Sequence, residues 1–360
     1  MKAAVLRTIP GKLTIEDVQI DKPGPREVLV QTAAAGVCHS DYHFLTGAYE
    51  TPLPTVMGHE SAGVVEAVGE QVSYVSPGDH VITSLSVFCG HCEYCLSGRM
   101  ALCPHGDTMR PVEGASRLSQ NGAVIHQFSD VSSFAEQLLV HEHALVKIPS
   151  EMPLQQASLI GCAVTTGLGA VFRTAEVRPG ETVVVIGCGG VGLSAIQGAR
   201  IAGAGRVIAV DVVGSKLDAA LGFGATDKIN ATDTDPVESV LEMTRGGVDH
   251  AFDAIGKPST PGQAFAMLRP GGTATIIGMI PLGATIELPG VDFLAEKRIQ
   301  GSCMGSNQFR TDALRFVDFY FDGRLDLDSL ITDRLRLDQI GEAMDALETG
   351  EVARNVIVFN

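Results

Sequence analysis

The chain has 360 residues, of which 42 are acidic and 26 are basic, so its net charge is −16. A chain of this length is expected to form two domains of ordinary size. Its negative charge repels the phosphates of nucleic acids and anionic lipid surfaces, so neither is an expected partner.

No segment predicts insertion into a membrane. The apolar run before Arg7 is very short, and the longest uncharged stretches, around 157–172 and 270–286, are interrupted by Gly, Thr or Pro. A helix that spans a bilayer needs about 20 predominantly apolar residues. We therefore expect a soluble, cytoplasmic protein.

The chain up to about Pro149 has short, β-branched apolar runs that are separated by Gly, Pro and Asp. These runs lie at 28–30, 63–68, 79–82 and 134–140. The pattern favours small β-sheets or a barrel-like domain.

Four cysteines follow one another within this first part: Cys89, Cys92, Cys95 and Cys103. Their spacing is typical of a structural zinc site with four thiolate ligands. Thiolates this close repel one another unless a cation neutralises them, and the residues between them are too polar to order the loop. Two disulfides are the alternative, but four other scattered cysteines and the lack of a secretory signal give little support for an oxidising compartment.

From residue 181 onward, strand-like and helix-like segments alternate. Strands are predicted at 183–186, 206–210, 249–254 and 273–277, and helices at 190–202, 215–221 and 258–268. Such alternation indicates an α/β fold with a doubly wound parallel sheet. After about Gly305 the sequence predicts helices at 311–321 and 337–348 and a strand at 355–359, which should return to the first domain. The predicted boundaries are 1–163 and 304–360 for the mainly-β domain and 164–303 for the nucleotide-binding type of domain.

A glycine motif lies between the strand at 183–186 and the following helix, and it contains Gly187, Gly189, Gly190, Val191 and Gly192. Amides of such a loop and of the helix N-terminus bind a pyrophosphate. Asp211 ends the next strand, where an acid contacts the adenosine ribose. Lys216 could reach the ribose or a phosphate. The alternatives are a tight turn without a ligand and, for Lys216, a solvated surface lysine.

A second set of metal ligands is dispersed along the chain. Cys38, His59 and Cys162 would supply two thiolates and one imidazole, and such a set leaves one position on zinc open. Each residue alone is a weak signal, because a buried single cysteine is more often a small core residue. The residues that neighbour them in the sequence provide the main support for a metal site.

Those neighbours resemble the zinc-containing medium-chain alcohol dehydrogenases over essentially the whole chain. The matching segments are 36–41, 58–60, the cysteine quartet, 161–162, the glycine loop with Asp211, and 351–354. The long connector from Cys103 to Ser133 is similar to that of the liver-type (class III-like) branch. The resemblance implies a GroES-like catalytic domain interrupted by a Rossmann domain, two zinc ions per chain, NAD and a homodimer.

The resemblance also implies roles for single residues. Cys38, His59 and Cys162 match the catalytic zinc ligands, and Glu60 matches a nearby acid that approaches zinc during ligand exchange. Asp41 would hydrogen-bond His59, which would fix its tautomer.

Further matches concern the proton path and the cofactor. Ser40 matches the hydroxyl that contacts the alcohol, and His43 matches a histidine that exchanges the proton with solvent, although a histidine in a loop is the alternative for His43. For the cofactor, the matching residues are His39 and Arg354 at the phosphates and Thr166 and Val191 at the nicotinamide.

The sequence thus predicts an NAD-dependent zinc oxidoreductase that interconverts alcohols and aldehydes or ketones by hydride transfer. Leu85 lies where the family lines its alcohol pocket, and its aliphatic side chain suggests room for more than ethanol. A dinucleotide-binding sensor or structural protein without turnover is an alternative, as is an enzyme that keeps its NAD bound. A glutathione-dependent formaldehyde dehydrogenase is disfavoured, because Asp107 replaces an arginine of those enzymes and His43 replaces a tyrosine.

Overall fold

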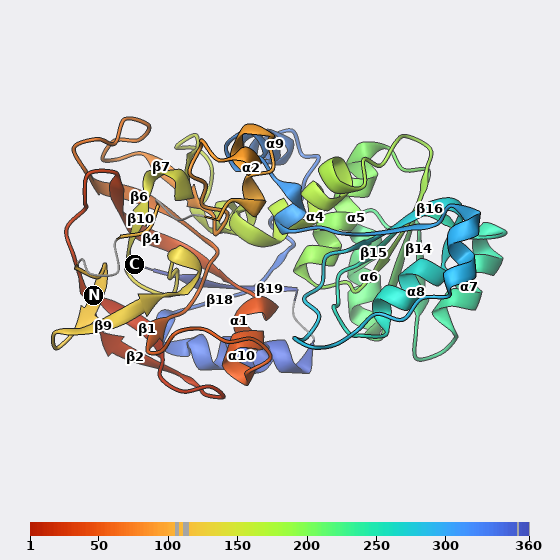
Figure 1. Cartoon of the computed structure of the whole chain (residues 1–360), viewed down its shortest axis with the longest axis horizontal. Helices are drawn as coiled ribbons and strands as arrows, with labels where there is room; N and C mark the ends of the chain where they lie inside the picture. The colour runs from red at the N-terminus through yellow and green to blue at the C-terminus, as the bar shows by residue number, and fades with distance from the viewer. Residues whose placement is uncertain (105–107, 111–114, 351–352, 360) are drawn as a thin grey trace. The chain divides into compact units, whose positions relative to one another are not determined.

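The computed structural model describes residues 1–104, 108–110, 115–350 and 353–359, so Asp107 and the first half of the segment 351–354 lie outside the described residues. The chain folds into two units, each with its own core (Figure 1). The first unit contains Met1–Cys162, Gln308–Gly323 and Leu327–Asn360, and the second contains Ala163–Asn307 and Arg324–Asp326. The chain thus leaves the first unit after Cys162 and rejoins it after Asn307, and Arg324–Asp326 belongs to the second unit again.

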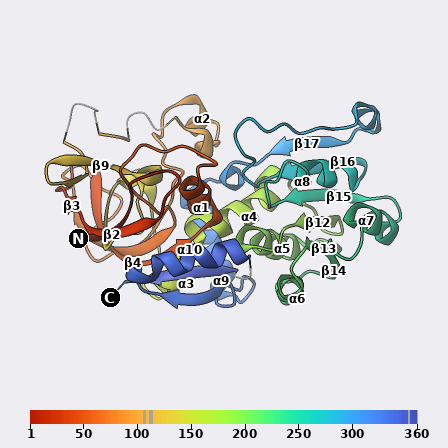
Figure 2. The ribbon, with the colours of Figure 1, turned by 90° about the horizontal axis from the view of Figure 1, so that it is seen from below.

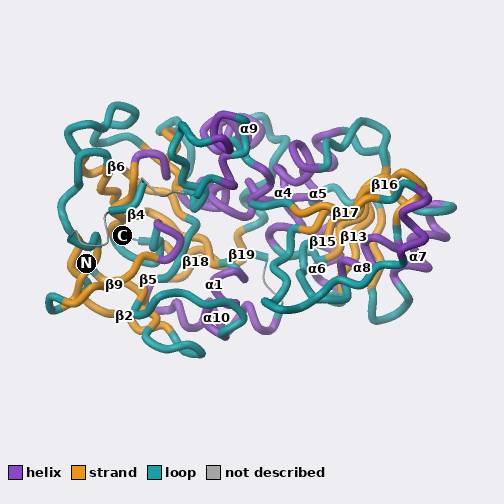
Figure 3. The backbone as a smooth tube through the Cα atoms, viewed as in Figure 1, coloured by secondary structure: helices purple, strands orange, loops and turns teal. Residues whose placement is uncertain are grey.

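The first unit is built from two sheets, as its β-branched runs predict (strands are orange in Figure 3). The six-stranded sheet has the order β2-β1-β5-β9-β8-β3, and the other has the order β11-β7-β6-β4-β19-β18, with β10 also paired to β4. Their bounds are β1 Lys2–Leu6, β2 Leu13–Asp17, β3 Gln19–Ile20, β4 Glu27–Val37, β5 Thr55–Val56, β6 Ser61–Val68, β7 His80–Thr83, β8 Leu118–Gln120, β9 Ala123–Gln127, β10 Gln137–His141, β11 Leu145–Lys147, β18 Ile331–Leu335 and β19 Arg354–Val358.

Strand β4 organises the larger sheet because it is long enough to pair with three partners. Along one edge it pairs with β6, and along the other it pairs first with β10 at residues 27–31 and then with β19 at residues 34–37. The C-terminal strand therefore returns to the first domain, as predicted. The end of β4 at Val37 lies directly before Cys38, so this strand positions the first candidate metal ligand.

The helices of the first unit include α1 His39–Thr46, α2 Glu93–Leu96, α3 Leu154–Leu159, α9 Phe309–Phe321 and α10 Ile340–Thr349, with short 3-10 turns such as η3 Glu142–Ala144 and η8 Leu337–Gln339. Helix α10 buries one face, which consists of Ile340, Ala343, Met344 and Leu347, in the core beside Phe134. This spacing of three and four residues is the helical pattern that the sequence shows. The helix predicted from 337 begins with a 3-10 turn and becomes α-helical at Ile340.

The second unit contains one parallel sheet with the order β14-β13-β12-β15-β16-β17, which can be followed from strand to strand in Figure 2. Its strands are β12 Thr182–Ile186, β13 Arg206–Asp211, β14 Asp227–Asn230, β15 Val248–Asp253, β16 Leu268–Ile276 and β17 Arg298–Gly301, and its helices include α4 Thr165–Gly169, α5 Gly190–Ala202, α6 Gly214–Gly222, α7 Pro236–Thr244 and α8 Thr260–Ala266. The predicted doubly wound α/β fold is confirmed.

The elements of this unit that were not predicted include β14 and α7. Strand β14 has the sequence Asp-Lys-Ile-Asn, with only one apolar residue, because it is an edge strand that buries little. Helix α8 is also shorter than predicted, since the chain enters β16 already at Leu268.

One helical stretch differs from the expectation drawn from the sequence. Leu154–Thr174 forms a continuous run of 21 residues that is long and apolar enough to cross a membrane, although 83% of its most apolar window is buried in the protein. Its glycines do not interrupt it. At Gly167 an added Cβ would lie 2.5 Å from the Val191 carbonyl oxygen, so the glycine allows close packing on α5 rather than a break. Burial of this kind is typical of a core helix, and length and composition alone are weak evidence for a membrane span.

Candidate active site

The structure brings Cys38, His59 and Cys162 together in the first unit, with Glu60 beside them. One potential ligand atom from each of the four residues lies within 4.8 Å of all the others. All four side chains are buried. Residues that are 124 positions apart in the chain, Cys38 and Cys162, thus form one cluster.

Strands β4 and β6 place the first three of these residues. Cys38 follows the end of β4 and is the N-cap of α1, whereas His59 and Glu60 precede the start of β6 at Ser61. The two antiparallel strands meet here, and the Gly36 amide donates to the Glu60 carbonyl at 2.9 Å. A side chain at position 36 would clash with the Glu60 side chain in its present position, so glycine gives that carboxylate its place beside the cluster.

Cys162 enters the cluster from the helical stretch that begins at Leu154. It lies in the π-helical segment η4 Ile160–Val164. The preceding residue, Gly161, lets this segment approach β7, because an added Cβ would be 2.5 Å from the Thr83 carbonyl oxygen. Single π-helical turns often occur at functional sites, where they change the direction of a side chain.

Asp41 fixes the orientation of His59. The Asp41 Oδ1 atom lies 3.0 Å from His59 Nδ1, and its Oδ2 atom accepts a hydrogen bond from the Cys38 amide at 3.2 Å. Because a carboxylate accepts, Nδ1 carries a proton, and Nε2 is the nitrogen that would supply a lone pair to a metal ion. The buried Nε2 atom has no hydrogen-bond partner among the described residues. An imidazole held by a carboxylate, with its other nitrogen unpartnered among thiols, fits a metal ligand.

The charges in the cluster are strongly coupled. The hydrogen bond with Cys162 lowers the pKa of Cys38, and nearby Arg354 and His59 lower it further, whereas the same bond and burial raise the pKa of Cys162. Arg354 is 3% exposed, and its Nη1 atom donates to the Val37 carbonyl at 2.9 Å. The cluster therefore has a buried cation nearby that favours thiolate over thiol, as a zinc ligand requires.

Helix α1 carries the residues of the predicted proton path. Ser40 and His43 are three positions apart on this helix, a spacing that puts them on one face. The Ser40 hydroxyl lies 3.6 Å from the Cys38 sulfur, so it is next to the cluster. His43 is partly buried, and burial lowers its pKa although Cys38 opposes the shift. His39, at the start of the helix, is exposed.

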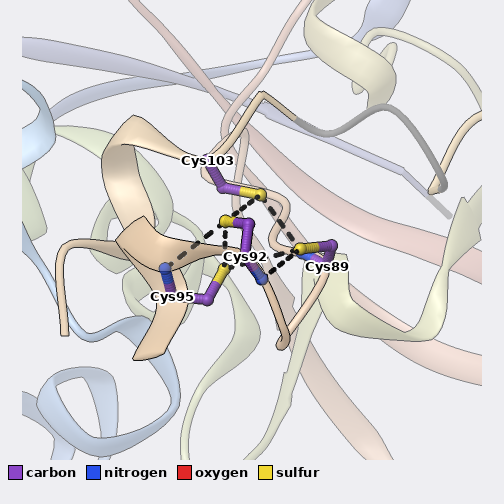
Figure 4. Close-up of side chains that lie close together, drawn as sticks. All are labelled: Cys89, Cys92, Cys95 and Cys103. Carbon is purple, nitrogen blue, oxygen red and sulfur yellow. Dashed lines mark hydrogen bonds between the residues drawn. The ribbon is translucent and has the colours of Figure 1, made fainter. Parts of the chain in front are cut away.

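The four other predicted ligands, Cys89, Cys92, Cys95 and Cys103, form a second cluster in the same unit (Figure 4). The sulfur atoms of Cys92 and Cys95 are 3.5 Å apart, and both the Cys89–Cys95 and the Cys92–Cys103 pairs are 3.8 Å apart. Four sulfurs at about 2.3 Å from a tetrahedral zinc are about 3.8 Å from one another. A disulfide would bring two sulfurs to about 2.05 Å, and all four cysteines are free.

Backbone amides surround these sulfurs. The amides of Cys89, Gly90 and Cys92 donate to sulfurs of Cys103, Cys95 and Cys89 at 3.3 to 3.4 Å. Such hydrogen bonds favour the charged form of a thiol. The amides of His91 and Cys92 lower the pKa of Cys89 to about 6. The quartet therefore fits a closed zinc site in sulfur spacing and in hydrogen bonding.

A group of side chains next to the quartet was not identified from the sequence. The His143 ring stacks on the Phe88 ring, with centroids 4.6 Å apart and an interplanar angle of 5°. Arg26 approaches His143 Nε2 at 3.0 Å, and His143 Nδ1 lies 2.6 Å from the Phe88 carbonyl. Because arginine only donates, Nε2 accepts and Nδ1 donates to that carbonyl. Phe88, directly before Cys89, is thus anchored by its ring and its backbone.

The glycine loop of the second unit lies between β12 and α5, as predicted. Gly187 has a φ of 97°, in the region that favours glycine. At Gly192 a side chain would clash with the Gly187 carbonyl, so glycine allows the helix to begin close to the strand. Gly189 is the N-cap of α5 without a side-chain cap, and an added Cβ would meet nothing within 4 Å. An open helix N-terminus of this kind fits a pyrophosphate.

Asp211 lies at the end of β13 and braces this loop. Its Oδ2 atom accepts from the Cys188 amide at 2.7 Å, and its Oδ1 atom accepts from the amides of Val212 and Val213 at 2.7 and 3.0 Å. A carboxylate has about four acceptor sites, so three of them are already used by the backbone. Asp211 therefore has a structural function that its sequence position did not reveal.

The remaining predicted residues lie in both units. Thr166 is buried in α4, and its hydroxyl is 3.5 Å from the Met304 sulfur. Val191 belongs to the first turn of α5, and Lys216 belongs to the first turn of α6. Leu85, in the first unit, packs against the core cluster that contains Val28 and Leu138.

Comparison with known proteins agrees with this architecture. The family model described as the alcohol dehydrogenase GroES-like domain matches residues 24–150, and the one described as zinc-binding dehydrogenase matches residues 190–318. An alcohol dehydrogenase zinc-binding domain protein from Burkholderia ambifaria is 36% identical, with a TM-score of 0.95 over 100% of this chain and 98% of that one.

Two further solved structures are similar over nearly their whole length. A benzyl alcohol dehydrogenase from Acinetobacter calcoaceticus is 33% identical, with a TM-score of 0.94 over 100% of this chain and 99% of that one. A protein from Sinorhizobium meliloti 1021 that is described as a zinc-binding dehydrogenase, bound to NADP, is 27% identical, with a TM-score of 0.85 over 99% of each chain. The chain belongs to the zinc-binding alcohol dehydrogenase family, and it has that family's GroES-like and Rossmann folds.

Proposed function

We propose that this protein is an NAD-dependent alcohol dehydrogenase with two zinc ions, one held by Cys38, His59 and Cys162 and one by the cysteine quartet. The observation that carries the proposal is the cluster of two thiols and one imidazole, in which the buried His59 Nε2 atom lacks a hydrogen-bond partner among the described residues. Three protein ligands leave one zinc position open, which is typical of catalytic sites.

When bound, the catalytic zinc acidifies an alcohol and polarises a carbonyl, and the nicotinamide accepts or returns the hydride. The protein contributes the surrounding proton transfer and positioning. The Ser40 hydroxyl, 3.6 Å from the Cys38 sulfur, would accept the alcohol proton while it gives up its own proton to the cofactor ribose, and His43 on the same helix face would exchange that proton with solvent. Asp41 keeps His59 oriented, and Arg354 helps to lower the pKa of Cys38.

NAD rather than NADP is the proposed cofactor because of Asp211. Its carboxylate would repel a 2′-phosphate, and Val212 and Val213, which follow it, offer no positive charge. Two unit charges about 4 Å apart interact by about 4 kcal/mol at an effective dielectric of 20, so a preference of about two orders of magnitude is reasonable after screening. The relative from Sinorhizobium meliloti was solved with NADP bound, so membership of the family does not by itself predict which of the two cofactors is preferred.

The proposed substrates are primary alcohols larger than ethanol, including aromatic ones, and the corresponding aldehydes. Leu85 is aliphatic and partly buried, and 33% identity to a benzyl alcohol dehydrogenase favours this class. We also propose the liver-type branch, from the long connector between Cys103 and Ser133, together with a cytoplasmic location and a homodimer. The edge strand β17 supports the dimer, since an unpaired edge is a natural surface for pairing between chains.

The test of the proposed function follows NADH formation with primary, secondary, allylic and aromatic alcohols, using protein of known zinc content. Turnover with NAD, about a hundredfold less efficient turnover with NADP and two zinc ions per chain are expected. NAD binding without turnover on any alcohol would indicate a sensor instead, and equal efficiency with both cofactors would contradict the function assigned to Asp211. Light scattering tests the dimer independently.

A further inference from the structure

Three consecutive residues of the second unit have left-handed backbone conformations. They form the turn Met304–Ser306 (η7), in which the φ angles are 47° for Met304, 67° for Gly305 and 50° for Ser306. A non-glycine residue in such a conformation costs on the order of 1 to 3 kcal/mol and persists only where the surroundings hold it. Met304 and Ser306 both need such support.

The turn lies against the helical stretch that carries Thr166. An added Cβ on Gly305 would be 2.8 Å from both the Gly169 Cα atom and the Thr166 carbonyl oxygen, so the two backbones touch. The Met304 sulfur lies 3.5 Å from the Thr166 hydroxyl. The position of the turn and that of Thr166 are therefore coupled by direct contact.

Thr174 contacts the last residue of this turn and the segment just before it. Its hydroxyl lies 2.8 Å from the Ser302 hydroxyl and 2.9 Å from the Ser306 hydroxyl. One hydroxyl donates one proton and accepts through its lone pairs, so Thr174 can satisfy both serines at once. Its carbonyl also accepts from the Gln300 side chain at 3.0 Å. Thr174 ends the π-helical segment η5 Ala170–Thr174, which follows α4 directly.

We propose that Thr174 is a positioning residue for the nicotinamide end of the cofactor site. Through Ser302 and Ser306 it holds the strained turn on the helix, and the turn in turn fixes the Thr166 side chain. This inference rests on the proposed function in one respect, namely that Thr166 lines the nicotinamide. The hydroxyl contacts and the backbone conformation of the turn do not depend on it.

The test compares Thr174→Val with Thr174→Ser. Valine keeps the β-branched shape and removes the hydroxyl, whereas serine keeps the hydroxyl. In the protein without cofactor, Thr174→Val should increase the hydrogen-exchange rates of the amides at 302–307 by about fivefold or more, since one hydrogen bond contributes roughly this factor. Dissociation constants for NADH should rise by a similar factor, and KM for the cofactor should change more than kcat. Thr174→Ser should restore both.

Thr244→Val is the matched control. Thr244 also ends a helix of the second unit, α7, and its hydroxyl also makes two hydrogen bonds, to the Val240 carbonyl and from the Gly247 amide. Its loss should leave exchange at 302–307 and NADH affinity unchanged. A second variant, Ser306→Gly, removes the other hydroxyl and relieves the backbone cost, so it should mobilise the turn without lowering the melting temperature.

Unchanged exchange at 302–307 in Thr174→Val would overturn the inference, as would equal losses of NADH affinity in Thr174→Val and Thr244→Val. Faster exchange with unchanged NADH affinity would also overturn it, because the turn would then not position the cofactor. A wild-type protein that binds neither NADH nor NADPH is a different result: it contradicts the proposed function, and the exchange data still decide whether Thr174 holds the turn.

Discussion

The two cysteine-containing clusters of the first unit are built in opposite ways. The quartet takes all its ligands from one short loop, and local amides of that loop donate to its sulfurs. The other cluster takes its ligands from the end of β4, the start of β6 and a π-helical segment, and it includes an imidazole that Asp41 orients. A local, closed site can order its own loop, whereas an open site needs the whole fold to hold its ligands and leave one position free.

The largest effect on turnover is expected from removing a ligand of the open cluster. Cys38→Ser or His59→Ala should lower kcat/KM by at least about three orders of magnitude, because several kcal/mol of transition-state stabilisation are lost. The fold should be largely retained, and zinc content should fall by about one ion per chain. Elemental analysis and steady-state kinetics on the same samples check this. A folded wild-type protein with one zinc ion or none would contradict the proposal that each of the two clusters binds a zinc ion.

A smaller loss is expected when the orienting carboxylate is changed. Asp41→Asn should reduce zinc retention or activity by about 10- to 100-fold, since partners of metal-bound histidines typically have effects of this size. Competition with a chelator measures zinc retention, and kcat measures activity. Asp235→Asn provides the control, because Asp235 also accepts backbone amides at a helix N-terminus, from Val237 and Glu238, and lies far from any ligand in sequence. Equal losses of zinc retention and activity in both variants would indicate that Asp41 only stabilises the start of its helix and does not orient His59.

The proton path predicts an effect that depends on pH. Burial lowers the pKa of His43, so in the wild type this side chain is neutral at pH 7 and stays a proton acceptor below its ordinary range. His43→Gln should therefore slow alcohol oxidation by about tenfold or more near pH 6, and the deficit should shrink as pH rises and hydroxide replaces the histidine. Imidazole buffers should partly restore the rate. If the rate of alcohol oxidation depended on pH in the same way in the variant and the wild type, His43 would have no function in proton transfer.

The smallest effect on turnover is expected at the closed cluster. Cys103→Ser should remove one zinc and lower the melting temperature by at least about 5 °C, because the loop loses the ion that orders it. Turnover per folded, catalytically loaded molecule should stay within about twofold of the wild type. Calorimetry, zinc analysis and kinetics measure these quantities. A loss of activity as large as that of Cys38→Ser would remove the functional distinction between the clusters.

The parts of the fold with strong periodic signals were predicted well. Helix α5 has the predicted bounds, and the strands β12, β13 and β19 lie within one or two residues of theirs. The weakly apolar strand β14 and the uninterrupted helical stretch Leu154–Thr174 were not predicted. In both cases tertiary packing outweighed the local signal, because an edge strand needs few apolar residues and glycines in a packed helix permit close contact.

Local spacing also determined which cysteines form the closed cluster, because all four ligands come from a single loop. Residue types and neighbouring motifs identified Cys38, His59 and Cys162 as candidates, and these three residues do lie together. The chain positions alone contain no information about the π-helical turn at Cys162, the tautomer of His59 or the anchoring of Phe88 by His143.

What the sequence determined by itself is therefore the inventory: an α/β fold with a glycine loop, a thiolate quartet and a dispersed set of metal ligands. Tertiary structure decided how these groups are oriented. Asp211 shows this difference, since its place at the strand end follows from the sequence, whereas its three hydrogen bonds to backbone amides follow only from the loop that folds around it. The physical reason is that periodicity and spacing report which side chains are buried, but hydrogen-bond partners and strained turns such as Met304–Ser306 depend on segments that are distant in the chain.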